Sequence, residues 1–235
     1  NVATTTYLGN VWTFLDCPGS IELIQEPYNV LMVVDAAVVV CEPEPQKALT
    51  LAPLLRFLDQ HNIPHVIFIN KMDIGVGSVR DTLAALQVQS AKPLVLREIP
   101  IRDGERVTGF VDLVSERAFR WTEGKRSALV EVPSSVAPRT AEARTGMLEA
   151  LADFDDALLE KLLEDVAPST GEIYAGLTRD LREDLIVPVF FGSAEGMHGI
   201  TRLLKALRHE APGPQHTAEK QQGIEATGEA CAQVF

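Results

Sequence analysis

Three short apolar runs without polar alternation constrain the fold of this chain more than any other feature. They are V-V-D-A-A-V-V-V-C at 33–41, H-V-I-F-I at 65–69 and V-P-V-F-F at 187–191. A strand that is buried on both faces of a parallel sheet reads as a nearly continuous apolar run, whereas a half-exposed strand alternates with polar residues. Helical apolar spacing at 50–61, at 79–86 and after Ile200 supplies the covering helices. The pattern predicts an α/β fold with a parallel sheet and helices on both faces.

The pattern changes after residue 91. The residues from Lys92 onward read as an antiparallel hairpin with Asp103 and Gly104 in the turn, and residues 116–122 can add a strand. Residues 139–166 read as helical, with a possible split at 153–156, and another helix is expected over 170–184. We therefore predict an antiparallel α+β subdomain inserted into the α/β domain.

The same pass sets the domain boundaries that we expect. Residues 1–91 form the first part of the main domain, residues 92–184 the insert, and residues 185–211 the last strand and helix of the main domain. Residues 211–222 are polar and contain Pro and Gly, which predicts a linker, so residues 212–235 are expected to hold this linker and the first strand of a further domain. Two other elements, a strand over 11–15 and a helix over 20–31, are expected near the start.

Composition excludes several classes of protein. The formal net charge of −12 disfavours nonspecific binding of nucleic acid by this surface. Three cysteines without C-x-x-C spacing disfavour disulfides and a thiolate zinc site, as expected of a protein in the reducing cytoplasm. No apolar run approaches the ~18 residues of a membrane span. The first residues resemble neither a signal peptide nor an initiator Met, so we expect the chain to begin inside a longer protein.

Polar loops follow three of the predicted strands. They are D-C-P-G at 16–19, N-K-M-D at 70–73 and G-S-A at 192–194. Open parallel sheets bind ligands at the carboxyl ends of their strands. The sequence therefore predicts that all three loops lie at one edge of the sheet.

The N-K-M-D loop matches the chemistry of guanine. The Asp73 carboxylate can accept two parallel hydrogen bonds from the ring N1–H and the 2-amino group, a donor pair that adenine lacks. With adenine the carboxylate would stay unpaired, at a cost of about 1–3 kcal/mol. Asn70 can bridge loops or touch the ring, and the Lys71 stem can lie over the base. Ser193 and Ala194 would close the pocket with a backbone donor and a small side chain.

The D-C-P-G loop suits the phosphate end of the same nucleotide. Asp16 can hold Mg²⁺ through a water, and the Gly19 N–H can reach a γ-phosphate, with Cys17 and Pro18 between them. A loop held in this way is an order–disorder switch. D-x-x-G arises by chance about once in a chain of this length, so the prediction depends on the far rarer N-K-x-D and on the order of the three loops.

Together these motifs resemble the translational GTPases, and most closely the G domain of bacterial elongation factor G. The resemblance also rests on D-A-A-V-V-V at 35–40, on T-G-F-V-D-L-V at 108–114 with Trp121, and on G-S-A-E-G-M-H-G-I at 192–200. It implies a P-loop-NTPase-like fold, GTP or GDP with Mg²⁺ as ligands, and GTP hydrolysis that drives ribosomal translocation. It also implies that residues 92–184 are the characteristic insert of the family, and that the tail begins its second, barrel domain.

Two departures from the family pattern bear on activity. No G-x-x-x-x-G-K-[ST] phosphate loop occurs, and family order places it, with the first switch, before Asn1. This chain alone is therefore expected to bind GTP poorly and to be inactive. The family also has a catalytic histidine where this chain has Ser20, directly after Gly19. A serine cannot become cationic, so a paralogue that acts as a ribosome-associated switch with weak hydrolysis is the alternative.

Each loop also has a simpler interpretation. Residues 16–19 could be a plain turn, Asp73 could only cap a helix, and G-S-A is a weak signal by itself. The chain could also be a scaffold piece that binds no nucleotide. The combination of the three loops favours the GTPase interpretation over these alternatives.

Overall fold

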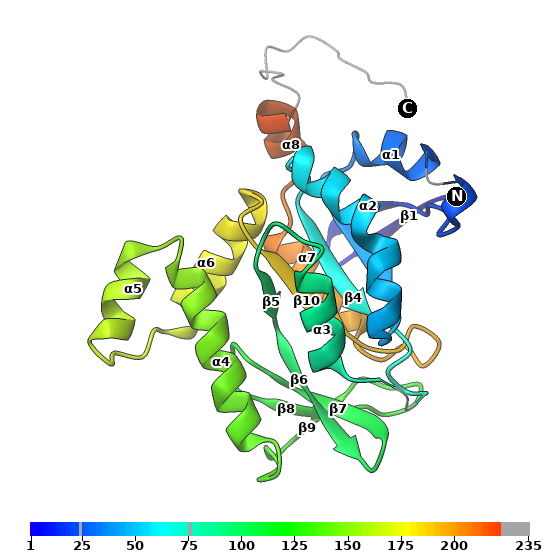
Figure 1. Ribbon diagram of the computed structural model, residues 1–235. Coiled ribbons are helices and arrows are strands. Elements are labelled where there is room, and N and C mark those ends of the chain that lie inside the picture. The colour runs from blue at the N-terminus through cyan, green and yellow to red at the C-terminus, as the bar shows by residue number, and fades with distance from the viewer. Residues whose placement is uncertain (24, 75–76, 222–235) are drawn as a thin grey trace.

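A four-stranded parallel sheet forms the centre of the molecule (Figure 1). The fold was analysed in a computed structural model that describes residues 1–23, 25–74 and 77–221. The strand order in the sheet is β3 (Ala37–Cys41), β4 (His65–Ile69), β10 (Val187–Phe191) and β5 (Leu94–Leu96). Every neighbouring pair runs parallel, as the apolar runs predict.

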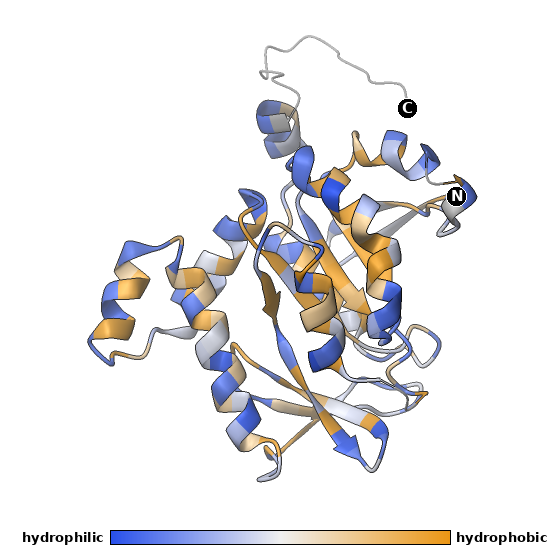
Figure 2. Ribbon diagram, in the orientation of Figure 1, coloured by the Kyte–Doolittle hydropathy of each residue, from blue (hydrophilic) through white to orange (hydrophobic). Residues whose placement is uncertain are grey.

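Helices cover both faces of this sheet because the side chains of β4 and β10 alternate between two apolar cores. Ile67 and Ile69 point into a core shared with α2 (Ala48–Gln60) and α3 (Val79–Gln87). Val66 and Phe68 point into a second core, shared with α7 (Ile200–Glu210) and the end of α6 (Thr170–Arg182). Figure 2 shows the central strands as the most hydrophobic part of the molecule. The predicted α/β architecture is confirmed.

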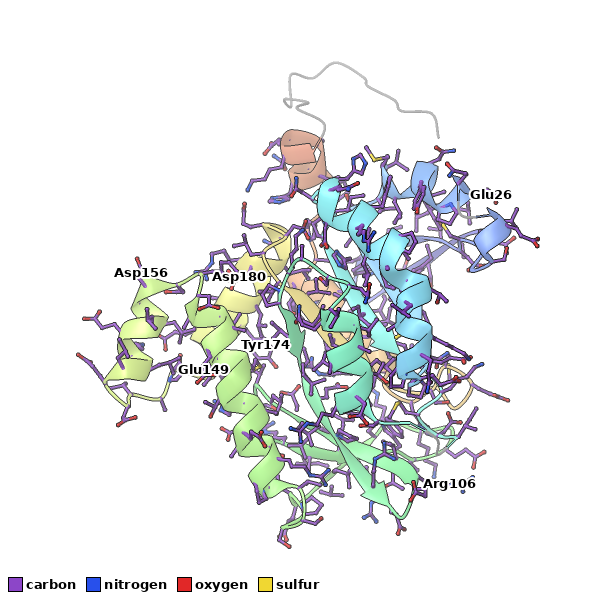
Figure 3. The ribbon with its side chains drawn as sticks, viewed as in Figure 1. Glu26, Arg106, Glu149, Asp156, Tyr174 and Asp180 are labelled. Carbon is purple, nitrogen blue, oxygen red and sulfur yellow. The ribbon has the colours of Figure 1, made fainter. Side chains whose placement is uncertain are left out.

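The insert is built on an antiparallel sheet in which neighbouring strands follow one another in the chain. Its strands are β6 (Glu98–Asp103), β7 (Arg106–Asp112), β8 (Ala118–Arg120) and β9 (Ala128–Val130). The predicted hairpin turn is present, with Gly104 at φ +56°, and Figure 3 shows Arg106 at its tip. The helix α4 (Ala137–Ala152) packs against this sheet, and α5 (Asp156–Leu163) and α6 pack on α4 in the same apolar core.

The predicted long helix is split, as its acidic stretch suggested. The Asp155 side chain accepts a hydrogen bond of 3.1 Å from the Leu158 N–H and caps the start of α5. An N-cap residue leaves the helical conformation, so the chain must turn at this point. The two helices α4 and α5 therefore replace one continuous helix.

The strand predicted over 11–15 exists but lies outside the parallel sheet. It is β2 (Asn10–Leu15), which pairs antiparallel with β1 (Val2–Tyr7) in a separate two-stranded sheet. The expectation that all three polar loops share one edge of one sheet is therefore wrong for 16–19. The physical reason is that β2 pairs with the segment directly before it, through a tight turn at Leu8 and Gly9.

Two further expectations about strands need correction. The run at 33–41 yields only β3, which is an edge strand, and Val38 and Val40 are 36% and 56% exposed instead of buried on both faces. The apolar run from Lys92 is not one hairpin arm, because β5 joins the parallel sheet while β6 begins the antiparallel one. The chain changes sheets at Arg97, whose side chain is fully buried.

The ends of the described chain add short helices. The predicted helix over 20–31 is the 3₁₀ turn η1 (Ile21–Leu23) and α1 (Gln25–Leu31), and a second such turn, η2 (Pro45–Lys47), precedes α2. The linker expected after residue 211 instead contains α8 (Pro214–Gln221), which is tied to the body by a 2.7 Å hydrogen bond from Thr217 to Asp35. The barrel strand expected in the tail lies outside the described residues.

Candidate functional site

Two of the three predicted loops meet at the carboxyl ends of adjacent strands. Asn70 follows β4, and its side-chain oxygen accepts a hydrogen bond of 2.8 Å from the Ala194 N–H. The Met72 N–H donates to the Gly192 carbonyl over 3.0 Å, and the Gly192 N–H donates to Ile69 over 2.9 Å. Three hydrogen bonds at the sheet edge thus join two loops whose residues Asn70 and Ala194 are 124 positions apart in the sequence.

The Asp73 carboxylate stands next to this junction without a partner. It is half-buried, and no hydrogen bond or ion pair reaches it from residues 1–23, 25–74 or 77–221. A carboxylate held near a protein surface with its acceptor sites open can take up a pair of external N–H donors. The arrangement offers what a guanine edge requires.

Lys71 is held beside the same loop by its backbone and its charge. Its φ of +61° lies in the left-handed region, which lifts the side chain out of the line of β4. Its ammonium group forms an ion pair with Glu42, which follows β3. Hydrogen bonds from Lys47 and Lys71 lower the pKa of Glu42 to about 2, so Glu42 stays ionised at neutral pH. The sequence pattern gave no signal for Glu42, since it lies 29 residues from its partner.

The G-S-A loop is closed by hydrogen bonds within itself. Ser193 is buried, its hydroxyl accepts from the Gly196 N–H over 3.2 Å, and its backbone pairs with that of His198 in both directions. The Ser193 and Ala194 N–H groups, one of which was expected to meet the base, are both engaged inside the protein. The small Ala194 side chain remains exposed at the junction.

Glycine is needed at one position of this loop for close packing. A side chain at Gly192 would place its first carbon 2.2 Å from the His198 carbonyl oxygen, far inside van der Waals contact. The loop therefore folds back directly over the end of β10. This explains the Gly before Ser193 by packing, independently of any ligand.

Trp121 of the insert supports the loop from outside. Its indole ring stacks on the His198 imidazole with ring centres 4.9 Å apart and planes 3° apart. In the sequence analysis, Trp121 is named only as part of the family resemblance. Its contact with His198 joins residues 77 positions apart in the sequence, so no local pattern could reveal it.

The D-C-P-G residues lie apart from this junction, beside the N-terminus. The Asp16 N–H donates to the Asn1 carbonyl over 2.7 Å, and the Asp16 carboxylate accepts from the Asn1 amide over 3.2 Å. Gly19 and Ser20 are exposed, Cys17 and Pro18 are half-buried, and a side chain at Gly19 would meet nothing within 4 Å. Burial, followed by the charge of Asp16, raises the pKa of the Cys17 thiol, which disfavours a reactive thiolate.

Asp16 is the one metal ligand that the sequence interpretation names. Mg²⁺ keeps several waters and is commonly held by one or two carboxylates together with substrate phosphates. An exposed carboxylate that accepts one long hydrogen bond suits such a water-mediated contact. Within the described part of the chain, no group of three or more His, Cys, Asp or Glu side chains could hold a metal without a ligand's help.

Two general expectations can be compared with the structure. No helix in the described ranges is long and apolar enough to cross a membrane. Of the three cysteines, Cys17 and Cys41 are both free thiols, and burial raises the pKa of Cys41 to about 12.

Comparisons with known proteins show which family the chain resembles. The family profile described as "Elongation factor Tu GTP binding domain" matches residues 1–213. The chain is 44% identical to an "Elongation factor G-like protein" of Synechocystis over all of its length and 35% of that relative. It is 30% identical to "Elongation factor G 2" of Geobacter metallireducens, with 92% of this chain and 32% of the relative covered.

A solved structure of a protein from Thermus thermophilus also superimposes on the chain. The TM-score is 0.78 at 25% identity, over 94% of this chain and 33% of that protein. The chain thus spans about one third of the length of the relatives it matches. By its profile match and its identity to these relatives, the chain belongs to the elongation factor G-like translational GTPases.

Proposed function

We propose that this chain supplies the guanine-recognising part of a GTPase that binds and hydrolyses GTP to drive ribosomal translocation. The observation that carries the proposal is the hydrogen bond between Asn70 and Ala194, which fixes two loops around the open carboxylate of Asp73. Asn70 ties the loops together, Lys71 flanks the base, and Ser193 and Ala194 form the far wall. The phosphate cradle that hydrolysis needs is absent from this sequence, so activity belongs to the full-length protein.

The phosphate end of the nucleotide is assigned to residues 16–20. Asp16 would hold Mg²⁺ through a water, and the Gly19 N–H would contact the γ-phosphate. When bound, the metal ion would neutralise part of the negative charge of the phosphates. Support comes from exposure, since Gly19 is open to solvent with free space around its Cα. These residues directly follow the separate β1–β2 hairpin, so the parallel sheet itself does not set their place relative to residues 70–73.

The guanine assignment is tested by changing the acceptor. In the full-length protein, GTP should bind at least about fivefold more tightly than ATP, because an unpaired Asp73 costs about 1–3 kcal/mol. Asp73→Asn should weaken the binding of GTP and strengthen the binding of xanthosine triphosphate, whose 2-oxo group can accept a hydrogen bond from the new amide. Asp103→Asn, an exposed change at the hairpin tip, is the matched control. Equal affinities of the unaltered protein for GTP and ATP would defeat the proposal.

A second function within the family is supported by Ser20. The residue stands where the family has its catalytic histidine, and its side chain is exposed, next to the proposed γ-phosphate contact. A hydroxyl cannot take or carry a positive charge near pH 7. The protein would then be a ribosome-associated switch that binds GTP and hydrolyses it slowly. The rate of hydrolysis separates the two functions.

A further inference from the structure

A cavity away from the guanine loops has basic side chains as half of its lining residues. It has a volume of about 930 Å³ and lies between α6, α7 and the start of α8. Its basic lining residues are Arg179, Arg182, Arg202, Lys205, His209 and His216, and its acidic ones are Glu183 and Glu210. In a chain with a formal net charge of −12, such a concentration of positive charge calls for an explanation.

Helical spacing builds the cavity from two facing stripes. On α6 the residues Tyr174, Thr178 and Arg182 recur every four positions, and on α7 Arg202, Lys205 and His209 recur every three or four. Residues at this spacing share one face of a helix. The cavity is therefore the groove between the packed helices α6 and α7.

The charges on the floor of the groove are neutralised inside the protein. Glu210 is buried and accepts two hydrogen bonds, of 2.5 and 3.0 Å, from the buried Arg97. Arg202 forms an ion pair with Asp112, and its Nε lies 3.5 Å from Glu98. These groups hold α7 to the sheets and have little charge left to offer a ligand.

The acidic group at the rim is also neutralised. Glu183 is paired with Lys220, and Arg179 is paired with Asp155 and Asp180. Neither of the two glutamates therefore opposes the binding of an anion.

Two cations of the rim remain without a carboxylate. No ion pair or side-chain hydrogen bond reaches Arg182 or Lys205 from any part of the chain that the structure describes, and both are exposed. The ring of His216 lies at the same rim, where its Nε2 is 3.2 Å from the Arg182 carbonyl oxygen. One helix thus presents a guanidinium and the facing helix an ammonium to the same space.

We propose that this groove is a binding site for a phosphate-bearing small molecule of nucleotide size. Guanidinium and ammonium groups together are the usual partners of phosphate oxygens. Ligand pockets commonly have volumes of about 300–1,000 Å³, so the groove has room for an organic body as well as the phosphates. The half-buried ring of Tyr174 and the small side chains of Ala175 and Ala206 form the apolar part of the lining. The site is formed by other residues than the guanine loops, and its existence does not depend on the proposed GTPase activity.

Lysine modification locates the site directly. The full-length protein is treated with an amine-acylating reagent with and without inorganic tripolyphosphate, and mass spectrometry follows Lys205 and Lys125. Lys125 is exposed on the loop between β8 and β9 and serves as the internal control. Tripolyphosphate should slow the acylation of Lys205 by at least about threefold and leave Lys125 unchanged. Equal effects on both lysines would mean general screening by the anion and would overturn the proposal.

A matched pair of variants provides the second measurement. Arg182→Gln with Lys205→Gln removes the two unpaired cations, and Lys125→Gln with Arg126→Gln removes the same charge elsewhere. In equilibrium dialysis, the first variant should bind one equivalent of tripolyphosphate fewer than the unaltered protein, and the second should bind the same number. If both variants lose binding alike, or neither does, the groove is not a phosphate site. Both changes lie on exposed side chains, so the fold should be retained.

Discussion

Ser20 is the residue at which we expect the chemistry of this chain to differ from that of its family. It directly follows Gly19, and its side chain is exposed while its carbonyl accepts a 3.1 Å hydrogen bond from the Leu23 N–H. A histidine at this position could orient or polarise an attacking water, and a positioned acid–base group typically contributes about 10²–10⁴ in rate. A serine side chain has no group that titrates near neutral pH. The local backbone, however, is free to carry the larger side chain.

Replacing Ser20 therefore tests how the protein uses GTP. In single-turnover hydrolysis by the full-length protein on ribosomes, Ser20→His should raise the rate at least about tenfold. Ser20→Ala should change it little, because the hydroxyl is not expected to act on the water. If the unaltered protein already hydrolyses GTP at the rate of the family and Ser20→His gains nothing, slow hydrolysis is excluded and the translocase function remains.

At the scale of elements, the insert and the G-S-A loop are coupled through one aromatic stack. Trp121 follows β8 of the insert, and His198 lies just before α7 of the main domain. Offset or parallel aromatic pairs contribute about 0.5–1.5 kcal/mol beyond their buried area. Because the backbone of His198 also pairs with Ser193, the stack restrains the loop that holds Ala194 against Asn70.

Removing the stack should loosen that loop. In Trp121→Leu we expect the amides of residues 193–198 to exchange with solvent about 2–10-fold faster, as follows from the energy of one aromatic pair. Trp121→Phe keeps an aromatic face and should change exchange less. Hydrogen exchange measured by mass spectrometry or NMR gives the rates. Unchanged exchange in Trp121→Leu would show that the hydrogen bonds of the loop suffice without the stack.

The sequence predicts a structural feature well when residues close together in the sequence determine that feature. The strands β4 and β10 follow from composition alone, because both of their faces are covered and every position is apolar or buried. The run containing β3 looks the same in the sequence, yet Val40 is exposed, since an apolar run cannot tell a central strand from an edge. Residues 70–73 and 192–194 were found by their chemistry, and their meeting follows from parallel topology.

Other features depend on contacts that are distant in the sequence. The Pro- and Gly-containing segment after residue 211 reads as a linker, but Thr217 bonds to Asp35 and α8 forms. The separate pairing of β2 with β1 depends on a Thr-rich segment, 2–7, that carries little apolar signal. These features depend on contacts between distant segments of the folded chain, and the spacing of neighbouring residues does not predict such contacts.

At the scale of the whole molecule, a buried cluster of charges joins the insert to the parallel sheet. Arg97 lies where the chain passes from β5 to β6, and its guanidinium is bound by Glu210 of α7. Arg202 of α7 reaches back to Asp112 of β7 and lies 3.5 Å from Glu98 of β6. Arg97 and Arg202 also lie 5.3 and 5.6 Å from the centre of the Phe190 ring. The cluster fixes the packing of α7 against β6 and β7. An uncompensated charge in it would therefore weaken the contact between the insert and the parallel sheet.

Glu98 makes the stability of this junction depend on pH. Burial raises its pKa from 4.5 to about 8, despite the opposing charge of Arg202, so the folded chain keeps a proton that the unfolded chain loses near pH 4.5. Stability should fall as pH rises through that window, by at most about 1.4 kcal/mol per pH unit from this group. Glu98→Gln removes this titrating group, so the variant should not lose stability in the same way. The difference in denaturant midpoint between the variant and the unaltered chain should therefore grow in favour of the variant from pH 5 to pH 8. The exposed change Glu149→Gln on α4 should give no such trend, and parallel curves for Glu98→Gln would show that Glu98 ionises normally in the fold.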